Sequence, residues 1–212
     1  MNAEPRLTPK SDPVPFAGLI LQPGATAFWP VYPKGAENDD MLKPNREIAY
    51  RDTDGAVHGS PSRRFLADRG DATVIFALQA SGKLRYHVGI DLYAVPGDKV
   101  LAIAAGRIVS FYPFYAAASG QMTYALFVEH NGVVCNYGEV TADTAAKLGL
   151  AVGEEVFGGQ WIGVVSDTKM LHFETYEIGT VKNLRWMQDG TPRPPALQNP
   201  TKLLLWLSEN AV

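Results

Sequence analysis

Apolar and polar residues alternate along much of the segment 81–178, which is the pattern of strands that bury one face. In the run MLHFE, Leu171 and Phe173 fall on one face of a strand. Met170, His172 and Glu174 fall on the other face. The pattern and its turn residues predict a β core over 81–178, with strands at 99–112, 122–129, 132–138, 160–165 and 171–177.

Two short helices are predicted outside this alternation. The run TADTAAKLG has Thr141 as a candidate N-cap and Gly149 as a candidate C-cap. A second helix is expected to start at Asn199-Pro200 and to run through Leu207, with proline at its first helical position. The apolar run 71–79 is compatible with either a strand or a short helix.

The chain divides into three parts by pattern. Residues 1–80 are rich in proline at first, show little periodicity, and are expected to pack on the core as an N-terminal extension. Residues 81–178 form the predicted core, and residues 179–212 form a tail that carries the second helix. The 20 glycines and 15 prolines indicate many turns, as in a β-rich fold.

Composition narrows the function classes. With 212 residues, 46% of them hydrophobic, the chain can bury a substantial core. The net charge is −3 and no basic stripe occurs, which argues against nucleic acid as a partner. The N-terminus lacks the basic start and apolar run of a signal peptide, and no apolar run approaches the ~20 residues of a membrane helix.

Three single residues have simple structural interpretations. Cys135 lies in a strand-like run and is expected to be a small buried hydrophobic side chain. His130 precedes Asn131-Gly132, a two-residue hairpin turn, and is expected to be exposed at the tip. His58 is expected on a surface loop rather than in a ligand set.

Three residues from two separate parts of the sequence are potential ligands of a catalytic metal ion. In a strand, His87 and Asp91 point to the same face, and His172 lies on a later strand. Two imidazoles and one carboxylate are the ligand count of a catalytic zinc site with an open fourth position. Zinc in such a site acts as a Lewis acid and activates water. The His-x-x-x-Asp pair alone is a weak signal, and such a ligand set also accepts other divalent ions.

The residues around these ligands resemble a known family. The run YHVGIDLYAVPGDKVLA (86–102) is similar to the first motif of the lysostaphin-type (LytM-type) zinc endopeptidases of bacterial cell walls. The resemblance continues, in order, through AGRIV (105–109), VEHNG (128–132), YGE (137–139), GEEV (153–156), GGQWIGVV (158–165) and LHFE (171–174). It implies a mainly β fold, a compact antiparallel β-sandwich or barrel-sandwich hybrid. It also implies zinc held by His87, Asp91 and His172, and a peptidoglycan or other peptide substrate.

Two positions depart from the family pattern. The family usually has His-x-His-Phe-Glu in its last motif, and Met170 replaces the first of those histidines. It also usually has Tyr-x-His after the central strand, and Glu139 replaces that histidine. Methionine has no titratable proton, whereas a carboxylate beside activated water can serve as a general base. Glu139 is therefore the candidate catalytic residue, and the loop 166–169 is shorter than usual.

The sequence thus favours a zinc-dependent hydrolase that cleaves peptide cross-links of the cell wall. Two alternatives stay open: a scaffold or regulatory protein that has lost hydrolysis, and a zinc enzyme with another substrate. A cell-wall enzyme would act in the envelope or outside the cell by a route without a signal peptide, and otherwise the protein would be cytoplasmic. Asn38 or Asn45 could block the site from the N-terminal segment. The oligomeric state is not indicated.

Overall fold

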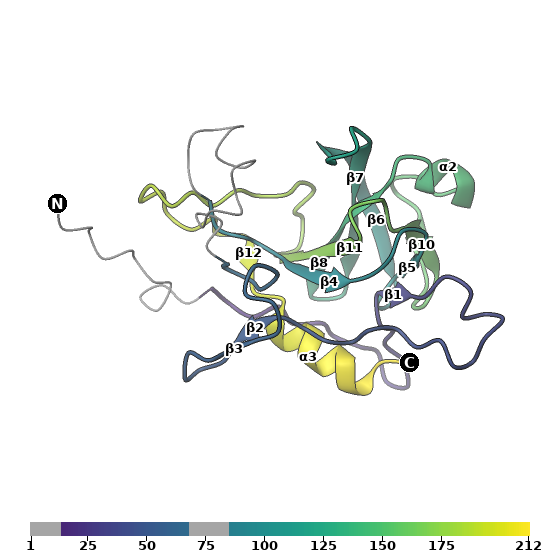
Figure 1. Cartoon of the computed structure of the whole chain (residues 1–212), viewed down its shortest axis with the longest axis horizontal. Helices are drawn as coiled ribbons and strands as arrows, with labels where there is room; N and C mark the ends of the chain where they lie inside the picture. The colour runs from purple at the N-terminus through teal and green to yellow at the C-terminus, as the bar shows by residue number, and fades with distance from the viewer. Residues whose placement is uncertain (1–13, 68–84) are drawn as a thin grey trace.

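The structure is a computed structural model that describes residues 14–67 and 85–212 (Figure 1). Its main sheet has seven antiparallel strands: β4 (Ile90–Tyr93), β6 (Gly106–Ala116), β7 (Met122–His130), β8 (Val133–Thr141), β9 (Glu155–Val156), β11 (Met170–Tyr176) and β12 (Leu197–Gln198). The order across the sheet is β12-β11-β8-β7-β6-β9, and β4 pairs with the first half of β11. Strand β11 therefore lies between β8 and β4.

Smaller elements surround this sheet. Strands β1 (Val31–Tyr32), β5 (Lys99–Leu101) and β10 (Trp161–Val164) form a second antiparallel sheet, and β2 (Tyr50–Arg51) pairs with β3 (Val57–His58). The described part of the chain also holds the helices α2 (Thr144–Leu148) and α3 (Thr201–Asn210). The predicted mainly β architecture, with antiparallel sheets and few helices, is confirmed.

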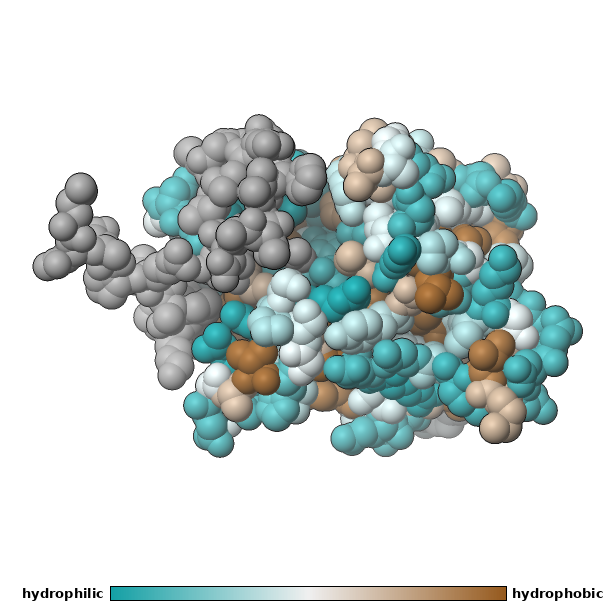
Figure 2. Space-filling view, in the orientation of Figure 1, coloured by the Kyte–Doolittle hydropathy of each residue, from teal (hydrophilic) through white to brown (hydrophobic). Residues whose placement is uncertain are grey.

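One hydrophobic core joins the two larger sheets. Val100 and Ile162 come from the smaller sheet, and Tyr137 and Phe173 come from the larger one, all fully buried. Because alternate residues of a strand face opposite sides, burying Leu171 and Phe173 turns His172 to the other face of β11. On the face of the molecule in Figure 2, exposed hydrophobic residues occur in small separate groups.

The N-terminal and C-terminal segments pack on this core and on each other. The backbone of Ala17 donates to Asn199, and Ile20 donates to Asn131 in the β7–β8 turn. At the very end of the chain, Val212 exchanges backbone hydrogen bonds with Ala27 and Trp29. The boundaries of the three parts at 80 and 178 stay predictions.

Most predicted strands agree with β7, β8, β10 and β11 to within three residues, but the predicted strand 99–112 is wrong. It is two strands in different sheets, because β5 ends at Leu101 and β6 begins at Gly106. Between them the chain changes direction, with Ala102 donating to the Gln160 carbonyl and Ile103 donating to the Tyr137 hydroxyl. A continuous apolar pattern does not reveal such a change of sheet.

The helix ends also differ in detail. Helix α2 starts at Thr144, so Asp143 rather than Thr141 occupies its N-cap position, while Gly149 ends it in the left-handed conformation as predicted. Helix α3 has Pro200 at its N-cap position rather than in the first turn, and it runs to Asn210. The apolar run 71–79 lies outside the described residues. None of the described helices has the length and apolar character needed to cross a bilayer.

His130 is buried, so the prediction of an exposed histidine at the hairpin tip is wrong. The turn itself forms at Asn131-Gly132, with Gly132 at a φ of +91°. The histidine ring turns inward, where Nδ1 donates to the Ala105 carbonyl (3.0 Å) and Nε2 accepts from the Tyr137 hydroxyl (2.9 Å). Burial lowers the pKa of His130 from 6.5 to about 4.

Two further sequence predictions concern side-chain exposure. Cys135 is fully buried as predicted, and burial raises the pKa of its thiol. His58 is exposed as predicted, although it lies in β3 rather than in a loop, and its Nε2 lies 2.9 Å from Asp52 Oδ2.

The Tyr137 hydroxyl is expected to stabilise the core through its two hydrogen bonds. Tyr137→Phe leaves the Ile103 N–H and the Nε2 of His130 without partners, so the free energy of unfolding should fall by about 2 kcal/mol. Urea denaturation measures this change. Tyr124→Phe, which removes the same atom from a half-buried ring, is the control and should stay close to wild type. Equal losses in both variants would contradict the role of the buried network.

Stability should also depend on pH through His130. In the unfolded chain His130 becomes protonated as the pH drops below 6.5, whereas in the folded chain it stays neutral down to about pH 4. The free energy of unfolding therefore falls as the pH drops from 6.5 to about 4. His130→Gln removes the titrating group and should flatten this part of the stability profile. The comparison requires denaturation curves of both proteins from pH 7 to pH 4. A wild-type slope that the substitution leaves unchanged would assign the dependence to other groups.

Candidate metal centre

The pairing of β4 with β11 brings the three predicted ligands together. Asp91 on β4 lies directly opposite His172 on β11. His87, just before β4, is fixed by backbone hydrogen bonds with Leu66 and Ala67 of the N-terminal segment. The close approach depends on Gly89, because a Cβ there would lie 2.7 Å from the Phe173 carbonyl oxygen and 2.9 Å from the His172 ring. No other residue fits this position without displacing the strand.

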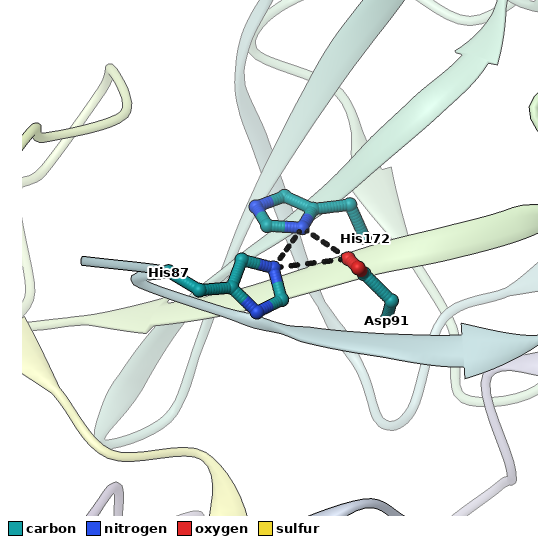
Figure 3. Close-up of side chains that lie close together, drawn as sticks. All are labelled: His87, Asp91 and His172. Carbon is teal, nitrogen blue, oxygen red and sulfur yellow. Dashed lines mark hydrogen bonds and ion pairs between the residues drawn. The ribbon is translucent and has the colours of Figure 1, made fainter. Parts of the chain in front are cut away.

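The three side chains point toward one another, Asp91 from β4, His172 from β11 and His87 from the segment just before β4 (Figure 3). Asp91 Oδ1 lies 3.0 Å from His87 Nε2 and 2.7 Å from His172 Nδ1, and the two nitrogens are 3.1 Å apart. All three side chains are buried, with exposed fractions of 2%, 4% and 7% for His87, Asp91 and His172. Sequence reasoning predicted this set, and the structure brings all of it to one point.

The outer nitrogens of the two rings fix which inner nitrogens carry lone pairs. His87 Nδ1 lies 2.9 Å from the Arg64 carbonyl oxygen, which can only accept, so Nδ1 carries the hydrogen. His172 Nε2 lies 2.9 Å from Glu174 Oε1, and Asn136 donates to the other oxygen of that carboxylate at 2.5 Å. Supports of this kind orient metal-binding histidines. The sequence did not reveal them, because a backbone carbonyl from residue 64 leaves no motif.

With both rings neutral, three acceptor atoms face one another without a hydrogen between them. Such a cluster requires a positive charge, which either a proton or a metal ion can supply. Burial alone lowers the pKa of His172, but Glu174 and Asp91 outweigh it and raise the pKa to about 10. Burial raises the pKa of Asp91, yet His87 and His172 hold it well below its usual range. Two nitrogens and one carboxylate oxygen fit a zinc ion.

Glu139 is buried beside this cluster rather than exposed at a strand end. It has a left-handed φ of +68° and forms a bulge in β8, because Gly138 pairs with Ala125 and Val140 pairs with the adjacent Tyr124. Gly138 lies against His172, where a Cβ would be 3.4 Å from the His172 Cβ. Bulges re-aim side chains next to active sites.

The environment of Glu139 favours its neutral form. Burial raises its pKa, the charge of His172 opposes this, and the charge of Asp91 adds to it. Hydrogen bonds from Thr168 and Tyr115 hold the carboxylate. Its Oε2 has no hydrogen-bond partner among the described residues. Backbone strain and an unpaired acceptor both cost stability, and they concentrate at functional sites.

Met170 and Phe114 lie near His172, whereas Asn38 and Asn45 lie in exposed parts of the N-terminal segment. Met170 lies two residues before His172 on β11 and is half-buried. It pairs with Tyr93 on β4. The Phe114 ring stacks on His172 with centroids 5.8 Å apart. Asn38 and Asn45 are exposed, and the Asn45 side-chain oxygen accepts from the backbone of its own loop. Blocking of the site by either asparagine stays a prediction.

Comparisons with known proteins bear on this cluster. The model of peptidase family M23 matches residues 85–184, a range that contains His87, Asp91, His172 and Glu139. No curated protein matches the chain. Among solved structures, Csd3 of Helicobacter pylori is 20% identical with a TM-score of 0.38, and the match covers 77% of this chain and 35% of Csd3.

Two further solved structures are similar at the same level. A zinc-containing peptidase from Vibrio cholerae is 18% identical with a TM-score of 0.40, and the match covers 80% of this chain and 41% of that one. CbpA from L. salivarius REN is 15% identical with a TM-score of 0.46, covering 78% and 99%. The match thus spans less than half the length of the Helicobacter and Vibrio proteins. By its family match, this chain carries over residues 85–184 a domain of peptidase family M23, of the LytM type that the sequence motifs resemble.

Proposed function

We propose that this chain is a zinc-dependent hydrolase that cleaves peptide cross-links of bacterial peptidoglycan. The observation that carries the proposal is the convergence of His87 Nε2, Asp91 Oδ1 and His172 Nδ1 within 3.1 Å of one another. It lies inside a domain of a peptidase family, which supports a peptide substrate. Zinc, when bound, supplies a Lewis acid for the scissile carbonyl and for water.

Glu139 is the proposed general base. A carboxylate must be ionised to accept a proton from water and must then release that proton to the leaving amine. Burial raises the pKa of Glu139 from 4.5, which makes this carboxylate a stronger base than an ordinary glutamate. Met170 cannot take either role, because a thioether neither binds nor releases a proton. One carboxylate would thus replace the two histidines of the family pattern.

Met170 also supports a second candidate function. With a thioether in place of one histidine, the domain could bind metal and a cell-wall peptide without hydrolysing it, as a scaffold or regulatory protein. The two candidates share the metal cluster and differ at Glu139. Only hydrolysis requires a titrating group at that position.

The purified full-length chain should contain about one zinc ion, and His172→Ala should remove it. The substitution leaves only two of the three ligands, and losing a protein ligand weakens zinc binding strongly. Elemental analysis by mass spectrometry after extensive dialysis gives the stoichiometry. His58→Ala is a matched control, since His58 lies 2.9 Å from a carboxylate but is exposed. A His172→Ala protein that retains zinc as well as the control would refute the ligand assignment.

Glu139→Gln should abolish the release of peptides from purified sacculi, with a rate at least about a hundredfold lower, because general acid–base groups contribute at that level. Zinc content should be unchanged, since Glu139 is not among the clustered ligands. Liquid chromatography of the soluble fragments measures the rate. Glu155→Gln, an exposed change on β9, is the control.

Two further readouts separate catalysis from folding. Wild-type activity should fall as pH drops through the raised pKa of Glu139, so the acid limb should lie above the pH expected for an ordinary glutamate. The melting temperature of Glu139→Gln should equal or exceed that of wild type, because a buried carboxylate with an unpaired oxygen is removed. Full hydrolysis by Glu139→Gln would remove Glu139 from the mechanism. No hydrolysis by zinc-loaded wild type would favour the scaffold candidate.

A further inference from the structure

An arginine from the N-terminal segment, Arg63, lies over the β4 strand close to the three proposed ligands. Tyr93 lies two residues after Asp91 on β4, and Met170 lies two residues before His172 on β11. Residues two apart on a strand point to the same face, so Tyr93 is on the face of the ligands, about 7 Å along the strand. The Arg63 guanidinium carbon lies 4.3 Å from the centre of the Tyr93 ring.

Arg63 is held in place from three sides. Its backbone carbonyl accepts the Asp91 N–H at 2.9 Å, and its own N–H donates to the Ser60 carbonyl at 3.0 Å. Its side-chain Nη1 reaches back to the Asp91 carbonyl oxygen at 3.4 Å. The guanidinium also lies over the Tyr93 ring. An arginine so oriented loses little conformational entropy when it binds a ligand.

The charge of Arg63 has no carboxylate partner in the described part of the chain. The guanidinium contacts there are the Tyr93 ring and the neutral carbonyl oxygen of Asp91. The clustered carboxylate of Asp91 is directed at the two histidines instead. A half-buried guanidinium with spare donors is the group that proteins use to bind carboxylates with two parallel hydrogen bonds.

We propose that Arg63 binds a free carboxylate of the peptide substrate, one or two residues from the bond at the metal cluster. This inference rests on the proposed function and narrows it to peptides with a carboxylate at that distance. The carboxylate is either the C-terminus of a short peptide or an acidic side chain. Arg63 is then a specificity residue, and it takes no part in proton transfer.

The test measures binding of four labelled peptides to the zinc-loaded full chain in the Glu139→Gln background, which prevents turnover. Two of them are tri-alanine as the free acid and as the carboxamide. The other two are the carboxamide with glutamate or glutamine as its last residue. Fluorescence anisotropy gives each dissociation constant. One acidic peptide should bind about ten- to a hundredfold more tightly than its amide counterpart, as expected for charged hydrogen bonds.

Substitutions then assign the preference to Arg63. Arg63→Met keeps an apolar stem on Tyr93 and should abolish the preference, with zinc content and melting temperature close to wild type. Arg107 lies on β6, which β8 and β7 separate from β11 in the sheet. Arg107→Gln is the control and should keep the preference for acidic peptides. A preference that survives Arg63→Met would come from direct ligation of zinc by the peptide and would overturn the proposal. Equal affinity for acids and amides would also overturn it.

The same proteins separate this inference from the proposed function. Sacculi left intact by wild type, together with an acid preference that requires Arg63, would reject hydrolysis and support the carboxylate site. Sacculi that are cleaved, together with equal binding of acids and amides, would support hydrolysis and reject the carboxylate site. The terminal and side-chain acid pairs show which source of carboxylate Arg63 binds.

Discussion

The pairing of Asp91 with His172 across β4 and β11 is the constraint on which the site depends. It requires glycine at position 89, because any side chain there would collide with β11. It also places a short acceptor–acceptor contact of 2.7 Å in a buried setting, which is favourable only with a positive charge at that point. The N-terminal segment contributes by fixing the backbone and ring of His87. Residues more than 80 positions apart in the sequence thus form one cluster that requires a positive charge at its centre.

Two buried histidines have pKa values that their surroundings shift in opposite directions. Burial lowers the pKa of His130 to about 4, and its partners are a neutral carbonyl and a hydroxyl. His172 is equally enclosed, but Glu174 and Asp91 outweigh burial and raise its pKa to about 10. The first histidine serves as a neutral structural bridge. The second lies where a cation is needed.

Features that depend on local pattern and motif were predictable from the sequence. These are the mainly β fold, the hairpin turn at Asn131-Gly132 and the three residues that converge. Prediction failed where long-range packing decides the outcome. The split of 99–112 between two sheets depends on partners at Gln160 and Tyr137, and the burial of His130 depends on the residues that cover its turn. The Arg64 carbonyl reaches His87, and the Arg63 guanidinium reaches Tyr93, from a segment with no recognisable motif.

The bulge at Glu139 also bears on how the site can change over time. Since Gly138 and Val140 take the two adjacent partners on β7, Glu139 has no cross-strand neighbour there that must change with it. Its backbone is already held in a conformation that most side chains adopt only under strain. Exchange of one titrating side chain for another at this point therefore leaves the strand register untouched. The sheet and the cluster of His87, Asp91 and His172 can persist while the titrating side chain beside that cluster is replaced in a single mutational step.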